Sequence, residues 1–299
     1  MVGRGDRGEV LVAVKEQRGK IAKTMWNRGR HIAGGGGGTH LLNALLGERN
    51  LFPFPKSVYA VRDCLQVATG DMPNALVLDF FAGSGTTLNA TSLLNSMDGG
   101  SRRCVLVSNN EVEEKTARAL NTKGLFFGDP EFEQNGICRA VTVPRVRAAL
   151  TGVQPSGQPV EGSYTDGHNY ADGFGENAVF FDLAYGDPDA LETGTHFDDI
   201  VPLLWLAAGC QGNPDQLDVA DDWLMPEESP FAVLLDEDRL RAFLSALERR
   251  PDITHVWIVT DSENAFARMR SRIPGGRSVG MLYRDYLRNF IINAQQVAR

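Results

Sequence analysis

Residues 76–87, LVLDFFAGSGTT, decide how the chain is organised. An apolar run ends at Asp79, and two glycines and two threonines follow within eight residues. Together with the following TTLNATSLLN, this pattern is typical of a buried strand, a loop and a helix that begins directly from the loop. Glycine lets the backbone of such a loop come close to a ligand, so the stretch predicts a binding site as well as a fold.

The segments around this loop continue the alternation of helix and strand. Residues 57–69, SVYAVRDCLQVAT, place apolar side chains at helical spacing, and residues 102–111, RRCVLVSNNE, predict a second strand. Residues 111–124 predict a helix that ends at Gly124. This order and spacing predict parallel strands joined by right-handed crossover helices, which is an α/β fold.

The second half of the chain changes character before the α/β pattern returns. Residues 152–177 are rich in Gly, Pro, Asn and Asp, which predicts an excursion that contains a hairpin. Residues 178–189 predict a strand and a turn, and residues 196–209 predict a core-packed helix that ends at Gly209. Further strands are expected at 231–236, 254–261 and 278–283, each followed by a helix, at 238–250, 262–273 (with Ser262 as N-cap) and 284–296. Periodicity leaves open whether these units extend the first sheet or form a second one.

The composition fits one large domain or two smaller ones, with 299 residues of which 42% are hydrophobic. No window approaches 18 uninterrupted apolar residues, and the N-terminus lacks an apolar signal core, so we expect a cytoplasmic protein without a membrane span. The sequence has no Cys-x-x-Cys pair, and its histidines lack metal-ligand spacing. We therefore expect no metal site and buried thiols without disulfides at Cys64, Cys104, Cys138 and Cys210, with structural or solvated roles for His31, His40, His168, His196 and His255.

The charge is unevenly distributed along the chain. The net charge of −8 is not typical of a nucleic-acid binder, but residues 1–31 hold eight Lys/Arg against three Asp/Glu, a local net charge of +5. This basic arm could contact phosphates, although charge alone favours a solvated start. The glycine run at 33–40, AGGGGGTH, could be a hinge or a loop that folds over a ligand, and its entropy cost favours the hinge.

Three ligand classes use a glycine loop between a strand and a helix. A phosphate-binding P-loop needs Lys after its last glycine, where this chain has Thr86. A dinucleotide loop needs a third small residue, where this chain has Leu88. S-adenosylmethionine needs neither. Its ammonium calls for an acid near the loop, which Asp79 supplies, and its ribose hydroxyls call for an acid after the next strand, which Glu111 supplies.

At this point the sequence resembles a known family. LDFFAGSGTT is similar to the cofactor loop of DNA methyltransferases that methylate amino groups, the adenine-N6 and cytosine-N4 enzymes of restriction–modification systems. Residues 52–65, FPFPKSVYAVRDCL, resemble their second cofactor segment, which precedes the loop by about two dozen residues in the type III-like (beta) group, as it does here. Weaker similarity extends over residues 26–299, to the carboxyl-terminal half of such enzymes.

The resemblance implies a Rossmann-like sheet that binds S-adenosylmethionine, and a role for each matching residue. Asp79 would meet the methionine ammonium, Thr86 and Thr87 the carboxylate, and Glu111 the ribose hydroxyls. The loop against the cofactor would be formed by Phe80, Ala82, Gly83, Ser84 and Gly85. The methionine side would be lined by Phe54, Pro55, Lys56 and Ser57. Ser57 departs from the family, which often has proline there.

The catalytic residues of that family have no counterpart in this sequence. The family grips the target amino group with an Asp/Asn/Ser-Pro-Pro-aromatic tetrapeptide and stacks the ring on a flipped base. This sequence has no Pro-Pro pair, and we interpret YGDPDA at 185–190 and GDPEF at 128–132 as turns. In the type III-like order the tetrapeptide precedes the second cofactor segment, residues 52–65, which we call the Lys56 segment. We therefore expect a fragment, or one chain of a split enzyme, whose separate N-terminal half carries the tetrapeptide.

The resulting hypothesis is the cofactor-binding half of a site-specific DNA amino-methyltransferase, adenine-N6 by resemblance, which acts on double-stranded DNA only as the complete enzyme. Residues 1–50 would be the tail of a target-recognition region and a hinge, 51–151 the cofactor-binding half, 152–230 an excursion and helix, and 231–299 a C-terminal α/β region. Two rivals remain: a non-catalytic remnant or interaction module, and a nicotinamide-dependent oxidoreductase. Arg284, Asp285 and Arg288 are expected to form an ion-pair network on the last helix.

Overall fold

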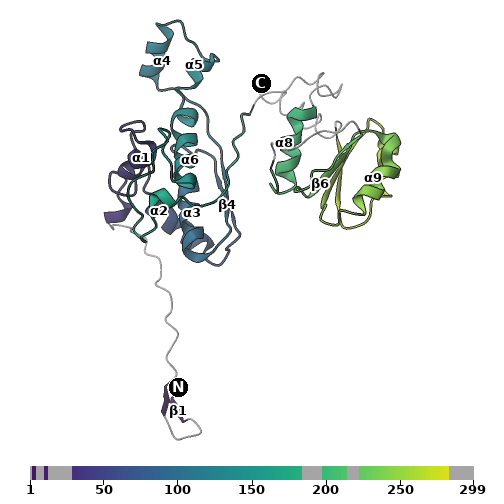
Figure 1. Cartoon of the computed structure of the whole chain (residues 1–299), viewed down its shortest axis with the longest axis horizontal. Helices are drawn as coiled ribbons and strands as arrows, with labels where there is room; N and C mark the ends of the chain where they lie inside the picture. The colour runs from purple at the N-terminus through teal and green to yellow at the C-terminus, as the bar shows by residue number, and fades with distance from the viewer. Residues whose placement is uncertain (1, 5–9, 13–28, 184–196, 214–221, 283–299) are drawn as a thin grey trace, which may run out of the picture. The chain divides into compact units, whose positions relative to one another are not determined.

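The computed structural model describes residues 2–4, 10–12, 29–183, 197–213 and 222–282, and it divides into two compact units, residues 1–181 and 182–299 (Figure 1). The division lies within the range 152–230 that composition groups together. The expected final helix at 284–296, with Arg284, Asp285 and Arg288, lies outside the described residues, as do YGDPDA at 185–190 and His196.

The first unit contains the predicted strand–loop–helix around residue 80. A short antiparallel pair, β1 (Val2–Arg4) and β2 (Val10–Val12), comes first. Then follow η1 (Gly29–His31), α1 (Thr39–Leu46), α2 (Val58–Thr69), β3 (Leu76–Asp79), α3 (Thr86–Asp98) and β4 (Arg103–Leu106). The rest is helical: α4 (Glu114–Asn121), α5 (Pro130–Glu133), the π-helical turn η2 (Cys138–Thr142), α6 (Val143–Thr151) and η3 (Tyr170–Asp172).

Strands β3 and β4 are parallel, as the alternation of strands and helices predicts. Their register runs from Leu76 opposite Arg103 to Asp79 opposite Leu106. The crossover helix α3 packs on β4 and α2, and the core beneath the sheet includes Leu41, Val58 and Leu93. The α/β class is therefore confirmed for this unit, although its described sheet has only two strands.

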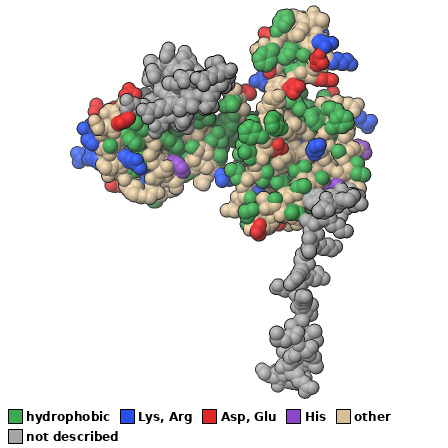
Figure 2. All heavy atoms as spheres, turned by 180° about the vertical axis from the view of Figure 1, so that it is seen from behind, with side chains coloured by type: hydrophobic (Ala, Val, Ile, Leu, Met, Phe, Trp, Pro, Cys, Tyr) green, Lys and Arg blue, Asp and Glu red, His purple; other side chains and the backbone are tan. Residues whose placement is uncertain are grey.

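One face of this two-stranded sheet is open. Val77 and Cys104 are half-buried on the helix side, whereas Leu76, Leu78 and Phe80 are 61%, 59% and 62% exposed on the other. Figure 2 shows apolar side chains gathered on the face of this unit turned to the viewer. Parallel sheets are normally covered on both faces. Within the described part of the unit, the β3–β4 pair is covered by helices on one face only.

The glycine run is packed in turns, where the sequence favoured a hinge. The N–H of Val58, the first residue of α2, donates to the Gly37 carbonyl over 2.7 Å, and the N–H of Thr39 donates to the Ala33 carbonyl over 2.9 Å. A Cβ at Gly38 would lie 1.8 Å from the Ala33 oxygen, and one at Gly37 would lie 2.5 Å from the Tyr59 ring. The glycines are needed because the backbone passes close to itself and to α2.

The excursion after α6 belongs to the first unit. Two antiparallel bridges, Val153 with Pro159 and Ser163 with Asn169, confirm the expected hairpin character. Tyr164 and Tyr170 from this segment join the core, with ring centroids 4.6 Å apart. The strand expected at 178–189 is absent from residues 178–183. Val179, Phe180 and Phe181 stay partly exposed there, because an apolar run becomes a strand only where another strand's backbone pairs with it.

The second unit is a separate sheet with helices on both faces. Its strands are β5 (Trp223–Leu224), β6 (Phe231–Leu234), β7 (His255–Val259) and β8 (Ser278–Leu282), in that order. The pair β5–β6 is antiparallel, and the other two pairs are parallel. This order settles the question that periodicity left open: among the described residues, the C-terminal units form a second sheet.

Alternation along the strands of the second unit builds two cores. Phe231 and Val233 face α8 (Phe197–Ala207), whereas Ala232 and Leu234 face α9 (Leu240–Leu247) and α10 (Glu263–Arg270). A 3₁₀ turn, η5 (Glu237–Arg239), leads into α9. Ser262 caps α10 as predicted, since its Oγ accepts from the Ala265 N–H over 3.2 Å. The predicted core role of α8 is confirmed.

Across the described ranges, every helix falls short of the length and apolar character needed to cross a bilayer. The same residues contain no cluster of three or more His, Cys, Asp or Glu that could hold a metal ion. The four cysteines form no disulfide, as expected, but the expected burial is wrong for Cys64 and Cys210, which are exposed. Cys64 lies on α2, whose buried residues are Val58, Tyr59 and Arg62.

Candidate functional site

Asp79 ends β3, and the loop that follows holds its carboxylate in place. Its Oδ2 accepts from the Thr87 hydroxyl over 2.5 Å, and its Oδ1 accepts from the Phe81 N–H over 3.2 Å. Its backbone carbonyl accepts from the Val107 N–H over 2.8 Å, which ties the end of β3 to the segment after β4. The side chain is half-buried at the carboxyl end of the parallel pair, where α/β sheets bind ligands.

Gly83 and Gly85 shape the loop between Asp79 and α3. Their φ angles are +51° and +76°, a region in which side chains other than glycine are strained. A Cβ at Gly85 would lie 3.3 Å from Thr142 Cγ2, and the Thr142 hydroxyl donates to the Gly83 carbonyl over 2.6 Å. The loop therefore rests on η2 and α6, and α3 begins directly from Gly85.

The side chains of Ser84 and Thr86 lie under the loop, where they contact Arg145 of α6. The Arg145 Nη1 donates to Ser84 Oγ over 2.8 Å and to Thr86 Oγ1 over 2.7 Å. Its Nη2 donates to Asn89 Oδ1 over 3.4 Å, and Asn89 donates to the Tyr164 hydroxyl over 2.9 Å. The resemblance assigns Ser84 and Thr86 to the cofactor, yet both are buried, so their hydroxyls position the loop from below.

Sequence reasoning missed Arg145. A signal was present: Val141, Arg145, Ala148 and Ala149 follow one another at helical spacing, so an arginine occupies an apolar helix face. All four side chains are buried. Such a position indicates that the arginine meets polar groups inside the protein, but not which ones.

The second cofactor segment lies beside the glycine loop. A Cβ at Gly83 would be 3.7 Å from Phe52 Cζ, so the two segments that sequence similarity pairs are neighbours in the fold. Phe54 and Lys56 are exposed, while Pro55 is buried. Ser57 is buried and caps α2: its Oγ accepts from the Ala60 N–H over 3.5 Å and donates to the Arg30 carbonyl over 2.6 Å.

Glu111 follows β4 at the same edge of the sheet as Asp79. Its side chain is exposed, and its carbonyl accepts from the Ile137 N–H over 2.9 Å. The neighbouring Asn110, which sequence reasoning did not single out, fixes this segment by donating to the Glu133 carbonyl over 2.7 Å and accepting from the Arg139 N–H over 3.1 Å. The Asn110 side chain also donates to the Glu133 carboxylate, which holds the pKa of Glu133 below its ordinary value.

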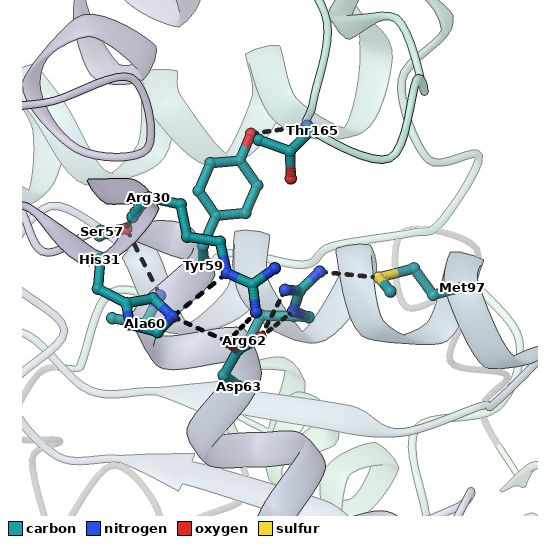
Figure 3. A network of polar contacts seen from close by, with 9 residues as sticks. All are labelled: Arg30, His31, Ser57, Tyr59, Ala60, Arg62, Asp63, Met97 and Thr165. Atoms are coloured by element: carbon teal, nitrogen blue, oxygen red, sulfur yellow. Dashed lines mark hydrogen bonds and ion pairs between the residues drawn. The ribbon is translucent and has the colours of Figure 1, made fainter. Parts of the chain in front are cut away.

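Three side chains, Arg30, His31 and Arg62, surround Asp63 and fasten the chain before the glycine run to α2 (Figure 3). Asp63 Oδ2 contacts Arg30 Nη2 at 2.5 Å and His31 Nε2 at 2.8 Å, and its Oδ1 accepts from Arg62 Nε over 2.7 Å. Tyr59, one turn earlier, accepts from the Thr165 N–H over 3.0 Å. Helix α2, which follows directly after Lys56 and Ser57, is thus the place where residues 30 and 31 and the excursion meet.

We expect the free energy of unfolding of the first unit to depend on pH through the Asp63 cluster. Burial raises the pKa of Asp63, but hydrogen bonds from His31, Arg62 and Arg30 outweigh it and leave the pKa below the ordinary value of 3.8. The cluster therefore contributes fully above pH 3.8 and is lost as the pH falls through the lowered value. At pH 7, Asp63→Asn is expected to lower the free energy of unfolding by about 1–3 kcal/mol in urea titrations.

Asp71→Asn serves as the control for this prediction, because Asp71 is exposed on the loop that precedes β3. The difference between wild type and Asp63→Asn should shrink in titrations below pH 4, whereas Asp71→Asn should track wild type throughout. An Asp63→Asn deficit of the same size at pH 3 and pH 7 would show that the carboxylate charge contributes nothing.

The remaining predicted histidine and turn roles can be placed. His168 Nε2 contacts the Gly173 carbonyl at 2.6 Å, and the His255 ring stacks on Trp257. His40 is exposed. The GDPEF segment forms a turn and α5, in which Asp129 Oδ2 accepts from the Phe126 N–H over 2.7 Å. The histidine roles agree with the sequence predictions, whereas residues 130–132 of the predicted turn belong to the helix α5.

Comparison with known proteins relates the first third of the chain to DNA methylases. Residues 5–106 match the N6_N4_Mtase family model, which is described as DNA methylase. The type II methyltransferase M.KpnI of Klebsiella pneumoniae is 36% identical over 94 residues, 31% of this chain and 21% of the relative. The EcoPI Mod subunit of Escherichia phage P1, from a type III restriction-modification enzyme, is 37% identical over 109 residues, 36% of this chain and 16% of the relative.

A second Mod subunit, that of the type III enzyme StyLTI from Salmonella typhimurium, is 39% identical over 72 residues, which is 22% of this chain and 11% of the relative. The matches thus span about a fifth or less of each relative's length. The matched family region contains both the Lys56 segment and the glycine loop. The predicted resemblance to type III-like DNA methyltransferases is confirmed for this part of the chain.

Proposed function

From this relationship we propose that the chain is the cofactor-binding half of a site-specific DNA amino-methyltransferase that uses S-adenosylmethionine, with adenine N6 as the target atom. One observation carries the proposal: the Asp79 carboxylate is fixed by Thr87 and Phe81 beside a glycine loop that the Lys56 segment adjoins. In a bacterial cell, an enzyme acting on the chromosome would work in the cytoplasm.

The donor set around the loop fits S-adenosylmethionine. The half-buried Asp79 offers a carboxylate for the ammonium. The N-terminal turn of α3 suits the cofactor carboxylate through its backbone N–H groups, while the Thr87 hydroxyl donates to Asp79 and holds it in place. Gly83 and Gly85 leave room for close approach, with Phe80 and Ala82 completing the loop. Phe54, Pro55, Lys56 and Ser57 would line the methionine side, and the exposed Glu111 would accept from the ribose hydroxyls. The bound cofactor supplies a methyl group on a sulfonium, which an amino nitrogen of the base can accept.

This sequence lacks the Pro-Pro tetrapeptide, so the proposal needs a further half of the enzyme that carries it, either on a longer form of this polypeptide or on a separate one. The open apolar face of the β3–β4 pair supports such a partner, because covering it would complete a parallel sheet. Double-stranded DNA would be bound by the complete enzyme, with residues 1–50 as the tail of its target-recognition region. A non-catalytic interaction module would use the same open face but would not need an intact Asp79 site.

Calorimetric titration of the full chain with S-adenosylmethionine tests the proposal. We expect saturable binding, and we expect Asp79→Ala to weaken it about 10- to 100-fold, because a hydrogen-bonded ion pair with the ammonium is lost. Asp71→Ala is the matched control, since it removes an exposed carboxylate before β3 and should leave the affinity unchanged. No binding by wild type, or equal binding by Asp79→Ala, would reject the cofactor site and favour the interaction module.

A further inference from the structure

Arg145 carries a buried positive charge directly beneath the loop. Its side chain has 0% exposure, and its Nη1 donates to Ser84 Oγ, Thr86 Oγ1 and the Ser84 carbonyl at 2.8, 2.7 and 3.3 Å. Its Nε has no hydrogen-bond partner. Burial lowers the pKa of Arg145 to about 10, so the guanidinium stays charged at neutral pH.

The groups that surround this guanidinium are neutral. Its contacts are the hydroxyls of Ser84 and Thr86, the Asn89 amide and, through Asn89, the Tyr164 phenol. Within the described ranges, no carboxylate forms an ion pair with Arg145. A buried ion without a counter-ion costs several kcal/mol of folding free energy. Holding the loop by hydrogen bonds would not by itself require a charge. The Asp79 carboxylate at the same turn bonds to Thr87 and Phe81 and not to Arg145, and a ligand anion bound against the loop would supply a further counter-charge.

The loop has a positive end and a negative end. At the positive end, the N-terminus of α3, a helix of 13 residues, lies over the Arg145 guanidinium, so the helix dipole and the side-chain charge add. At the negative end, the Asp79 carboxylate accepts from Thr87, the second residue of α3. A zwitterionic amino acid group, with its carboxylate toward α3 and its ammonium toward Asp79, matches both ends.

We propose that Arg145 is a positioning residue that makes the loop select a cofactor with a free carboxylate, by setting a positive potential behind the first turn of α3. This inference rests on the proposed function and deepens it. Arg145 acts through the loop and does not touch the cofactor, because Ser84 and Thr86 lie between its guanidinium and the outer surface of the loop. At an effective dielectric constant of about 20, a unit charge held behind the loop is strong enough to change affinity tenfold or more.

The test compares two ligands, S-adenosylmethionine and its decarboxylated form, by calorimetric titration of the full-length chain and its variants. Wild type should bind the carboxylate-bearing ligand about tenfold or more tightly than the decarboxylated one. In Arg145→Met this preference should fall to about twofold or less. Arg145→Lys keeps the charge and should keep most of the preference. Tyr164→Phe is the matched control, since it disturbs the same buried network without changing charge, and it should weaken both ligands equally.

The outcomes distinguish the role of Arg145 from the proposed function of the chain. If Arg145→Met weakens both ligands by the same factor, Arg145 only supports the loop and the inference is wrong. Should Arg145→Met fail to fold, wild type still decides, because equal affinity for the two ligands rejects carboxylate selection without any variant. Suppose that Asp79→Ala weakens S-adenosylmethionine binding but wild type binds the decarboxylated ligand equally well. The proposed function then stands, and the inference about Arg145 is wrong. If wild type binds neither ligand, the proposed function falls first.

Discussion

Replacing Gly152 by alanine is expected to lower the free energy of unfolding of the first unit by about 2–5 kcal/mol. Gly152 ends α6 with φ +73°, where its N–H donates to the Ala148 carbonyl over 2.9 Å. A Cβ there would lie 2.0 Å from the Ala171 carbonyl oxygen and 2.4 Å from its carbon. Both atoms are backbone, so they cannot move aside as a flexible side chain would. The variant must shift η3 away from α6 or strain both.

Gly157→Ala is the control for this effect. Gly157 also has a positive φ, +84°, but a Cβ at this position meets nothing within 4 Å. It should therefore show only the backbone strain, about 1–2 kcal/mol. Urea unfolding followed by circular dichroism measures both variants, and equal losses would mean that η3 does not press on α6 as described. A much larger loss in Gly152→Ala than in Gly157→Ala would confirm that η3 of the excursion packs tightly against the end of α6.

The second large effect concerns methyl transfer. The chain alone is expected to transfer no methyl group to DNA. Adding a polypeptide that carries the Asp/Asn/Ser-Pro-Pro-aromatic tetrapeptide should raise transfer to about 1000-fold or more above the background measured for the chain alone, since alignment of the target nitrogen with the methyl group supplies much of the rate. Transfer of a radiolabelled methyl group from S-adenosylmethionine to double-stranded DNA is the measurement. Methylation by the chain alone would contradict the proposal that it is only the cofactor-binding half.

The open face of β3 provides a structural test of the same restoration. Leu78→Asp places a charge on the exposed apolar face and should abolish the restored activity, while the chain keeps its cofactor affinity. Leu203→Asp is the matched control, because Leu203 is also an exposed leucine but lies on α8 of the second unit. If the added polypeptide restores methyl transfer to Leu78→Asp as fully as to Leu203→Asp, it does not cover this face.

Local pattern was enough to predict the elements around the glycine loop and most of the second sheet. The helix at 58–69, the strand at 76–79, the helix from Thr86 and the strands β6, β7 and β8 follow from side-chain periodicity, and the start of α10 follows from its cap at Ser262. The short strand β5 was not predicted. The strand expected after residue 178 did not form, because its apolar residues have no neighbouring strand in residues 178–183. Periodicity shows that a segment can be a strand, whereas pairing depends on the rest of the fold.

The sequence by itself determined the α/β class, the parallel strand–loop–helix around Asp79 and the relationship to DNA methylases, because these depend on residues close together in the chain. Only the tertiary structure decided that Arg145 lies under the glycine loop, 61 and 59 residues from Ser84 and Thr86, and that Arg30, His31 and Arg62 meet at Asp63. It also decided that the C-terminal strands form their own sheet. Such contacts arise from packing between distant segments, and no local spacing encodes which buried groups will meet.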